Sequence, residues 1–206
     1  MEPVTDLSYA PNPRSLPGLE KAVGQCRRCP LYAKATQAVA GQGPVLAAIM
    51  LVGEQPGNDE DLAGQPFVGP AGRLLDKALG ESGLERGSVY VTNAVKHFKF
   101  VPRGKRRLHQ RPNAEEISIC RWWIDIERKL VKPRLIVAMG ATAARSIAGK
   151  PVVIVRRRGL ISETDGVHLM VTIHPSWLLR MPDPRLRRAE FEAFVADLKR
   201  ARAFVL

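Results

Sequence analysis

The sequence contains few cysteines, no long apolar run and no recognisable export signal. Its 206 residues include three cysteines, an odd number that cannot form a closed set of disulfides, so we expect a reducing compartment. The longest wholly apolar run, Val45–Val52, is far shorter than the ~18 residues that a membrane-spanning helix needs. Residues 1–19 are proline-rich and have no apolar segment of the kind that signal peptides carry. These absences predict a soluble, cytoplasmic protein without a membrane partner.

Acidic residues are also scarce relative to basic ones. The chain has 20 Asp and Glu against 32 Lys and Arg, which gives a net charge of +12. Such an excess suits a polyanionic partner such as nucleic acid. However, 22 of the basic residues are arginine, and a compositional preference for arginine produces the same sum without any function. The position of the charges along the chain therefore matters more than their total.

Short apolar segments alternate with segments of helical periodicity. This pattern predicts a three-layer α/β/α sandwich with a central, mostly parallel four-stranded sheet. With a hydrophobic fraction of 45%, residues 18–206 are expected to form a single domain, preceded by a flexible arm at residues 1–17. The expected strands are residues 45–52, 89–92, 135–139 and 169–173, and the expected helices lie within residues 16–36, 73–82, 114–131 and 185–203 and after residue 140.

Three unusual segments directly follow expected strands. They are Gly53–Gly72, Asn93–Arg111 and His174–Leu179, and the second of them contains a long basic loop expected at residues 96–111. In a mostly parallel sheet, ligands bind beyond the carboxyl ends of the strands. We therefore expect the three segments to meet at one edge of the sheet and to form the functional site there.

The cysteines are spaced like metal ligands. Cys26 and Cys29 form a Cys-x-x-Cys pair, and Cys120 lies far downstream. Such a pair brings two thiolates to one metal, with the remaining ligands coming from elsewhere. His97 is a candidate for the fourth ligand because it follows the second expected strand. Three Cys and one His suit zinc or an iron–sulfur cluster, and spacing alone favours zinc; the alternative is ordinary buried thiols without a metal.

The first unusual segment is rich in glycine. Gly53–Gly57 has the sequence Gly-Glu-Gln-Pro-Gly, and a second glycine-rich stretch follows at Gly64–Gly72. Glycines allow a ligand to approach the backbone, and Glu54 offers a carboxylate directly after a strand. The segment lacks the Gly-Lys-Ser/Thr ending of a phosphate-binding P-loop. A long structural turn, with Phe67 as loop packing, is the alternative interpretation.

The other two segments each carry a histidine. Arg103–Arg111 holds five basic residues in nine and no acidic one, which suits phosphate binding; a solvated charged loop is the alternative. His109 lies inside this run, and Glu54 is a candidate carboxylate to pair with it. His174 follows the fourth strand and can donate a hydrogen bond to developing negative charge. The alternative there is a turn in which Ser176 caps a helix.

Taken in order, these segments resemble the uracil-DNA glycosylase superfamily, in particular its iron–sulfur family 4 and the closely related UdgX group. Lys105–His109, with the sequence Lys-Arg-Arg-Leu-His, resembles the insertion that distinguishes UdgX from ordinary family 4 members. The chain also has Gln55 where family 4 usually has Ala, as UdgX does. The resemblance covers about residues 20–200, and its other motifs are Gly53–Gly57, Gly64–Gly69, Val91–Lys96 and His174-Pro-Ser.

The resemblance implies roles for individual residues in removing uracil from DNA. Phe67 would stack on a uracil flipped out of the strand, and Asn93 would read the polar edge of that base. Backbone N–H groups around Gln55 would complete the recognition. His174 would stabilise the uracil anion as the glycosidic bond breaks.

In UdgX-type proteins the loop histidine itself attacks the sugar and leaves the protein joined to the abasic site. His109 occupies that position, and Glu54 is expected to orient it or to accept its proton. Because release would require breaking another C–N bond with a poor leaving group, the product should persist and the reaction should be stoichiometric. The basic side chains expected to bind the DNA are Lys105, Arg106 and Arg107.

The resemblance also implies a cofactor. Family 4 enzymes hold a 4Fe–4S cluster with four cysteines, one of which directly follows the Thr-Asn-x-x-Lys motif. This chain has a histidine there, as UdgX does. The implied cofactor is a structural 4Fe–4S cluster, remote from the base pocket, with the ligands Cys26, Cys29, His97 and Cys120.

Three functions remain open at this point. The first is uracil excision followed by a covalent link through His109, carried out by a monomer on uracil-containing DNA, with single-stranded DNA as the expected preference. The second is a conventional uracil-DNA glycosylase that uses water as nucleophile over many turnovers. The third, from a different class, is a zinc-stabilised nucleic-acid-binding module without catalysis.

Overall fold

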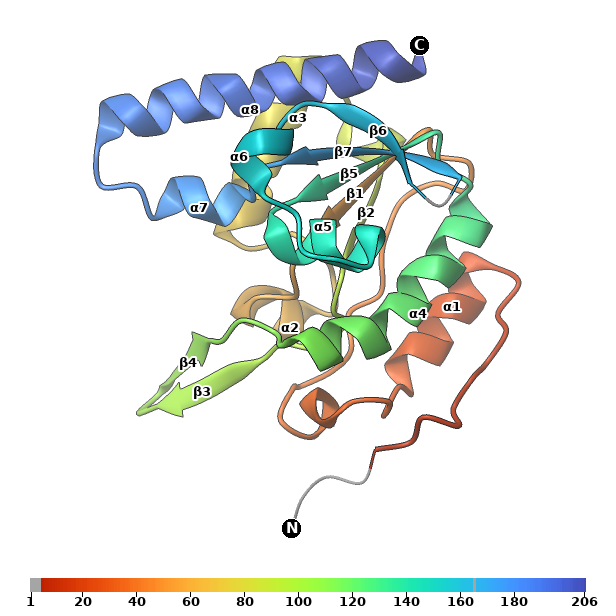
Figure 1. Ribbon diagram of the computed structural model, residues 1–206. Coiled ribbons are helices and arrows are strands. Elements are labelled where there is room, and N and C mark those ends of the chain that lie inside the picture. The colour runs from red at the N-terminus through yellow and green to blue at the C-terminus, as the bar shows by residue number, and fades with distance from the viewer. Residues whose placement is uncertain (1–4, 165) are drawn as a thin grey trace.

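A computed structural model of the protein describes residues 5–164 and 166–206. A five-stranded sheet runs through its centre in the order β2–β1–β5–β7–β6 (Figure 1). Neighbouring strands are parallel except at one edge, where β6 pairs with β7 in the antiparallel direction. The strands are β1 (Ile49–Gly53), β2 (Tyr90–Asn93), β5 (Leu135–Met139), β6 (Ile161–Thr164) and β7 (Val167–Thr172).

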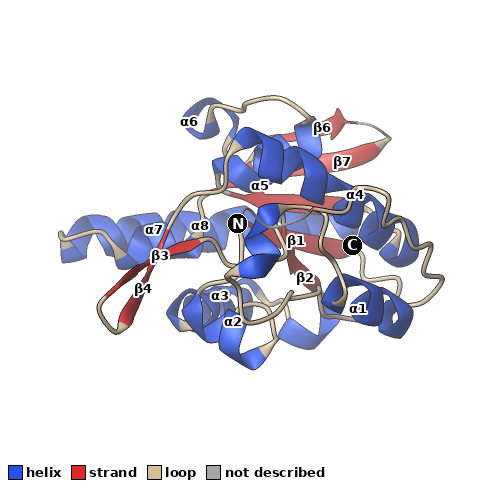
Figure 2. Ribbon diagram, turned by 90° about the horizontal axis from the view of Figure 1, so that it is seen from below, coloured by secondary structure: helices blue, strands red, loops and turns tan. Residues whose placement is uncertain are grey.

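Helices cover both faces of the sheet, which gives three layers (Figure 2). One face packs against α3, α7 and α8, and the other against α4 and α5, with α1 packed on α4. The expected α/β/α architecture is therefore confirmed. The helices are α1 (Leu16–Gly24), α2 (Asn58–Ala63), α3 (Pro70–Ser82), α4 (Ala114–Val131), α5 (Ala141–Ala148), α6 (Ile154–Arg157), α7 (Pro175–Leu179) and α8 (Pro184–Val205), with short 3-10 helices η1 (Pro30–Ala33) and η2 (Arg86–Ser88).

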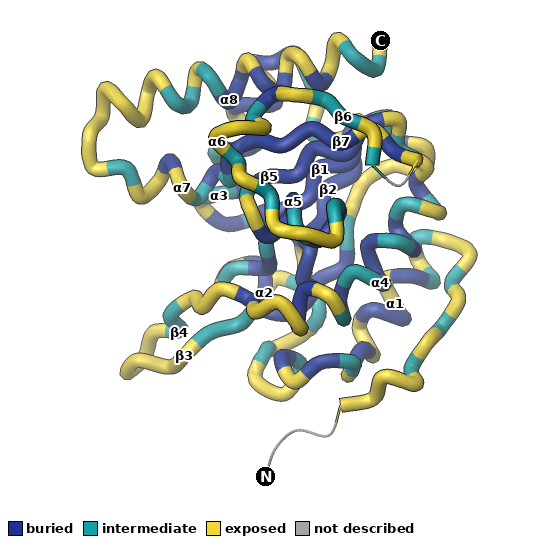
Figure 3. The backbone as a smooth tube through the Cα atoms, in the orientation of Figure 1, coloured by how far each residue is buried: buried dark blue, intermediate teal, exposed yellow. Residues whose placement is uncertain are grey.

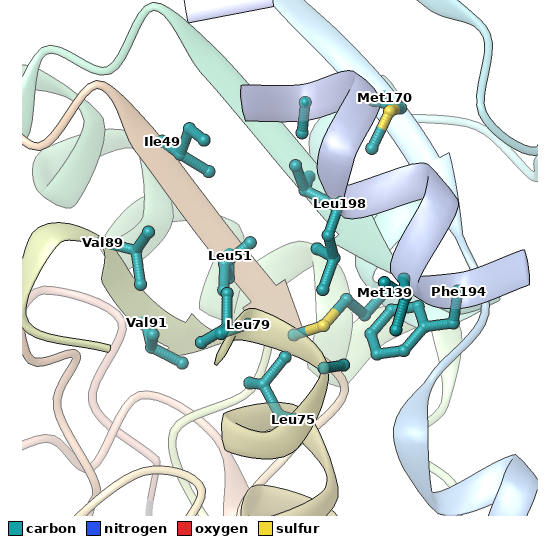
Figure 4. Close-up of a cluster of buried hydrophobic side chains, with 14 of the residues drawn as sticks. Ile49, Leu51, Leu75, Leu79, Val89, Val91, Met139, Met170, Phe194 and Leu198 are labelled. Atoms are coloured by element: carbon teal, nitrogen blue, oxygen red, sulfur yellow. The ribbon is translucent and has the colours of Figure 1, made fainter. Parts of the chain in front are cut away.

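The core forms because side chains alternate between the two faces of each strand. In β1, Leu51 packs with the side chains of α3 and α8, whereas Val52 packs towards α5. Leu75 and Leu79 lie four residues apart on α3 and so share the face that meets the sheet (Figure 4). Figure 3 shows the buried backbone concentrated in the central strands. The near-continuous apolar strands seen in the sequence thus result from burial on both faces.

The four predicted strands are present and parallel, but the sheet also contains a fifth strand that was not predicted. The fifth strand, β6, has a sequence, Ile-Ser-Glu-Thr, in which only one residue is strongly apolar. Its burial is intermediate because it lies at the edge of the sheet and pairs on one side only. Such a strand carries no continuous apolar signal, which is why the periodicity missed it.

The prediction of an irregular basic loop at residues 96–111 is wrong over its central part. There β3 (Phe100–Arg103) and β4 (Arg106–His109) form an antiparallel hairpin in which Phe100 pairs with His109. Gly104 supplies the turn with a φ of +57°, which glycine adopts without steric cost. The hairpin is short and largely exposed (Figure 3), so its charged side chains masked the strand pattern.

The described part of the predicted N-terminal arm lies against the domain. The Tyr9 hydroxyl donates to the carbonyl oxygen of Ala22 on α1 at 3.0 Å, and Arg28 donates to the Tyr9 carbonyl oxygen at 2.6 Å. Residues 1–4 of the arm lie outside the described residues. In the part of the chain that the structure describes, every helix is too short or too polar to cross a membrane.

Candidate active site

A cavity of about 1050 Å³ opens at the carboxyl ends of the central strands. All three unusual segments contribute to its walls, so the expected convergence is confirmed. The hairpin lies on one side of this region and α6 and α7 on the other (Figure 1). The lining residues that the sequence had singled out are Glu54, Gln55, Phe67, Asn93, His109 and His174.

Glu54 and His109 contact each other in the cavity. Glu54 directly follows β1 and His109 ends β4, and His109 Nε2 lies 3.2 Å from Glu54 Oε1. Thr142 on α5 donates its hydroxyl hydrogen to Glu54 Oε2 at 2.5 Å. Burial raises the pKa of Glu54, but the hydrogen bonds from His109 and Thr142 outweigh burial and hold the pKa below its ordinary value. At neutral pH an ionised carboxylate therefore faces an imidazole that is half exposed.

Phe67 and Asn93 approach each other because two neighbouring positions are glycine. A Cβ at Gly53 would lie 2.4 Å from Asn93 Oδ1 and 2.5 Å from Phe67 Cζ, and a Cβ at Gly72 would lie 1.7 Å from the Phe67 carbonyl oxygen. Phe67 has a φ of +58°, a left-handed conformation that costs a non-glycine residue about 1–2 kcal/mol. Asn93 Oδ1 is buried and has no hydrogen-bond partner among the described residues, so it is available to a ligand donor.

His174 is held as a neutral donor. Arg180 donates to Ser176 Oγ at 3.1 Å, and that hydroxyl lies 2.8 Å from His174 Nδ1. The backbone N–H of Ser176 also donates to Nδ1, at 3.2 Å. Because Nδ1 accepts, the ring hydrogen of a neutral imidazole is on Nε2. Burial lowers the pKa of His174 to about 4, which keeps the ring neutral.

The residue that caps α7 differs from the one named in the alternative interpretation of this turn. His174, and not Ser176, is the N-cap, and its ring nitrogen takes the place of the usual side-chain oxygen. Ser176 lies inside the helix and orients the ring instead. The ring centroid of His174 lies 5.9 Å from that of Phe67, so both predicted base contacts border one pocket.

The side chain of Gln55 holds the base of the hairpin. Its Nε2 donates to the carbonyl oxygens of Lys99 and Gln110 at 3.2 and 3.0 Å, and its Oε1 accepts from the Lys99 backbone N–H at 3.1 Å. Lys99 precedes β3 and Gln110 follows β4. Gln55 thus connects the two ends of the hairpin that carries His109, a role that sequence reasoning missed because the three positions are far apart in the chain.

The basic residues of the hairpin behave differently from one another. Lys105 and Arg106 are exposed. Arg107 turns back onto α2, where its Nη1 lies 2.6 Å from the buried Asp61 Oδ2 and its Nε donates to Asn58 Oδ1 at 2.9 Å. The guanidinium also lies over Phe100, 5.1 Å from the ring centroid. Arg107 therefore fastens the hairpin to the domain through contacts within the protein.

Replacing Arg107 by alanine is expected to lower the free energy of unfolding by about 3 kcal/mol, because the buried Asp61 carboxylate loses its cationic partner. Replacing the exposed Arg106 is expected to change it by less than about 0.5 kcal/mol. Urea unfolding of the two variants at pH 7 measures both values. Equal losses in the two variants would show that Arg107 does not hold the hairpin.

The three cysteines and His97 are buried away from the cavity. The cysteines lie in an apolar cluster where α1, η1 and α4 pack together, and His97 is buried in the segment that follows β2. Burial raises the pKa of Cys29 to about 11 and also raises that of Cys120. His97 Nδ1 is buried and lacks a hydrogen-bond partner among the described residues. In the same residues, no three His, Cys, Asp or Glu side chains lie close enough to hold a single metal ion.

A buried ion pair lies between the cavity and the cysteines. Lys96 Nζ lies 2.8 Å from Glu127 Oε2, and both side chains are fully buried. Lys96 Nζ also donates to the Thr92 hydroxyl at 2.6 Å and to the Asn93 carbonyl oxygen at 2.9 Å. The Lys96 backbone N–H donates to Cys120 Sγ at 3.3 Å. One buried lysine therefore anchors the segment that carries both Asn93 and His97. The sequence marked Lys96 only as part of the Thr-Asn-x-x-Lys motif and gave no signal for its partner Glu127.

Comparisons with known proteins agree with this geometry. A family model described as the uracil DNA glycosylase superfamily matches residues 40–199. The chain is 38% identical over 189 residues to a type-4 uracil-DNA glycosylase of Thermotoga maritima, covering 91% of this chain and 93% of the relative. It is 34% identical over 194 residues to that of Archaeoglobus fulgidus, covering 90% and 91% of the two chains. The chain therefore belongs to the uracil DNA glycosylase superfamily and is related over most of its length to type-4 members.

Proposed function

We propose that this protein removes uracil from DNA and then remains joined to the abasic sugar through His109. The observation that carries the proposal is the 3.2 Å contact of His109 Nε2 with the Glu54 carboxylate, in a cavity that also contains Phe67, Asn93 and His174. Uracil excision is supported by the type-4 relatives, which are named uracil-DNA glycosylases. The covalent step is supported by the position of His109.

Recognition requires that the uracil leave the base stack and enter the pocket. Phe67, in a strained conformation next to two obligatory glycines, provides a flat face on which the base stacks. The buried Asn93 Oδ1, which lacks a partner among the described residues, accepts a hydrogen bond from uracil N3–H. A pocket with a buried acceptor discriminates strongly against bases that lack a donor there.

Cleavage of the glycosidic bond makes the uracil negative and the sugar positive, and the cavity provides a stabilising group for each of them. The C1′–N1 bonding pair leaves with the uracil, whose oxygen becomes negative and accepts a hydrogen bond from the neutral Nε2–H of His174. The sugar becomes oxocarbenium-like, and the Glu54 carboxylate is the ionised group that stabilises it. Both groups keep these charge states at neutral pH, since the pKa of Glu54 is lowered and that of His174 is about 4.

The covalent step adds His109 to the sugar. A lone pair of the imidazole forms a C–N bond to C1′, and the ring thereby becomes cationic. Glu54, in contact with Nε2, orients the ring before the attack and accepts a proton from it. Departure of the ring would require breaking this new C–N bond, so each protein molecule reacts once.

A denaturing-gel assay separates the three functions. Wild-type protein is incubated with a single-stranded oligonucleotide that contains one uracil, and with a matched thymine oligonucleotide. With the uracil oligonucleotide, we expect free uracil and a retarded protein–DNA band that survives detergent and heat. With the thymine oligonucleotide, we expect neither. Uracil release without such a band would support the water-using enzyme, and binding that does not distinguish uracil from thymine would support the non-catalytic module.

The expected preference for single strands is tested by comparing the single-stranded oligonucleotide with a uracil-containing duplex. The expected monomeric state is tested by light scattering.

We infer that Cys26, Cys29, His97 and Cys120 hold a 4Fe–4S cluster. Three buried thiols and an imidazole nitrogen without a protein partner fit a group that takes thiolate and imidazole ligands. Among the described residues, no three His, Cys, Asp or Glu side chains are placed to hold one metal ion. The ligands of a four-iron cluster are spaced more widely than those of one zinc ion, whose Zn–S bonds are only ~2.3 Å long. The cluster would cross-link the segment between α1 and η1, the segment after β2, and α4, and its contribution is structural.

Replacing Cys120 by serine is expected to remove the cluster. The purified protein should lose a broad absorbance near about 400 nm and its bound iron, and the free energy of unfolding should fall by more than about 4 kcal/mol. Ser146→Ala, which changes another buried side chain, serves as the control and should keep the colour. One zinc per chain and no absorbance in the wild type would contradict the assignment.

A further inference from the structure

The cavity extends beyond the residues assigned to the uracil and its sugar. Its volume of about 1050 Å³ lies at the top of the ~300–1,000 Å³ range of pockets that hold one drug-sized ligand. It therefore has room for more than a single flipped nucleotide. The additional wall is formed by α6 and α7, which lie above the hairpin in the view of Figure 1, and includes Ile154, Val155 and Trp177.

We propose that Trp177 and Val155 form a second subsite in this cavity, where the base next to the excised uridine stacks on the indole ring. The ligand class is an unpaired nucleotide of single-stranded DNA. The proposal rests on the proposed function, since it assigns the part of the same cavity that uracil does not fill. It also gives a structural reason for a preference for single strands, because a paired base already stacks within its duplex.

The exposure of these side chains supports a ligand-binding role. Trp177 is 39% exposed and Val155 is 91% exposed, although both are large apolar residues. On the same short helix, Leu178 is fully buried in the core between α3 and α8, so it fixes the helix and directs Trp177 outwards. By contrast, Trp123 is fully buried and its ring centroid lies 4.6 Å from that of Trp122. An exposed, rigidly mounted indole at a cavity wall is a stacking platform for a base.

Charge on the rim favours a polyanionic strand. Arg156 and Arg157 on α6 directly follow Val155 and are exposed, and Arg180 after α7 is exposed as well. Arg158 is different, because its guanidinium is paired with Asp197 and Glu190. Helices α6 and α7, from which these cations come, lie on the other side of the region from the basic hairpin (Figure 1). A strand that crosses between the two would keep its phosphates near positive charge on both sides.

The test compares Trp177→Ala and Trp177→Phe with the wild type on three single-stranded oligonucleotides. One has normal bases around the uracil, and the other two have a tetrahydrofuran spacer in place of the base on the 5′ or the 3′ side. Single-turnover uracil release gives the half-saturating DNA concentration and the maximal rate. Leu179→Ala is the matched control, because Leu179 is an exposed apolar residue of the same helix that does not line the cavity.

For the wild type, one of the two spacers should raise the half-saturating concentration about 5- to 100-fold, the usual worth of base–aromatic stacking. Trp177→Ala should show the same loss on the normal oligonucleotide and no further loss with that spacer. Trp177→Phe should keep most of the affinity, and Leu179→Ala all of it. The maximal rate should change less than about threefold, because the indole contacts no reacting atom.

Binding also has a readout that does not depend on catalysis. The indole fluorescence of the wild type should be quenched by the normal oligonucleotide, and Trp177→Phe should lose most of that quenching. If Trp177→Ala binds all three oligonucleotides like the wild type, the subsite is wrong while the proposed function stands. If the wild type releases no uracil yet its fluorescence is quenched through Trp177, the proposed function fails and the nucleotide subsite remains.

Discussion

Replacing His109 by alanine or by serine is expected to abolish the heat-stable protein–DNA band entirely. Neither replacement has a ring nitrogen that can form a C–N bond to C1′, and His109 is the imidazole placed 3.2 Å from the Glu54 carboxylate. Uracil release is expected to continue at a reduced rate, because water can reach C1′ in the space vacated by the ring. The variant should thus become a multiple-turnover glycosylase, measured by uracil release per protein molecule on a uracil-containing single strand.

The control for this prediction is another exposed histidine. His168 lies on β7, where its ring packs on Phe204 with centroids 4.8 Å apart, and it does not line the cavity. His168→Ala should form the covalent band at the wild-type rate. A band that persists in His109→Ala would mean that a different side chain attacks the sugar.

Replacing Glu54 by glutamine is expected to slow both uracil release and adduct formation by about 10²- to 10⁴-fold, the usual worth of a positioned acid–base group. The amide keeps the size of the carboxylate and still accepts a hydrogen bond from Thr142. It removes the negative charge that stabilises the cationic sugar and that receives the proton of His109. Single-turnover rates on the same oligonucleotide measure both steps, and Glu163→Gln, at an exposed position on β6, is the charge-matched control.

The dependence on pH adds a second measurement at this carboxylate. The pKa of Glu54 is held below its ordinary value of about 4.5. The carboxylate is therefore ionised at every pH above 4.5 and loses its charge only as the pH falls through the lowered pKa. Between pH 8 and pH 5 the ratio of the wild-type rate to the Glu54→Gln rate should therefore stay constant. A ratio that falls steadily from pH 8 would show that the pKa of Glu54 is raised above its ordinary value, and would contradict the conclusion that its hydrogen bonds outweigh burial.

The parts of the fold that were predictable share a physical origin. Leu135–Met139 was recognisable because it is continuously apolar and buried, and Ala114–Val131 because it is long and periodic, so the composition of each segment reports its state. The hairpin at Phe100–His109 and the helix Asn58–Ala63 were missed. Both are short and largely exposed, and both form against neighbours that are distant in the sequence.

The candidate site divides in the same way. Glu54 and His174 were found because each closely follows a strand, and strands of one sheet that run in parallel end at a common edge. The proposed role of Asn93, the last residue of β2, came from the family resemblance. The clamp of Gln55 on the hairpin ends and the ion pair of Arg107 with Asp61 were not found. No local pattern marks such contacts, since their energy comes from burial and pairing that exist only in the folded chain.

By itself, therefore, the sequence determined the layer architecture and the edge of the sheet at which the cavity lies, because periodicity and chain order encode them, and its motifs marked residues that line this cavity. The tertiary structure alone decided which of those residues touch. It placed His109 against Glu54 and left the imidazole accessible. It also turned Arg107 away from solvent and left Asn93 Oδ1 without a partner among the described residues. Distances, burial and pKa values depend on groups brought together from separate segments, and only the packed chain defines them.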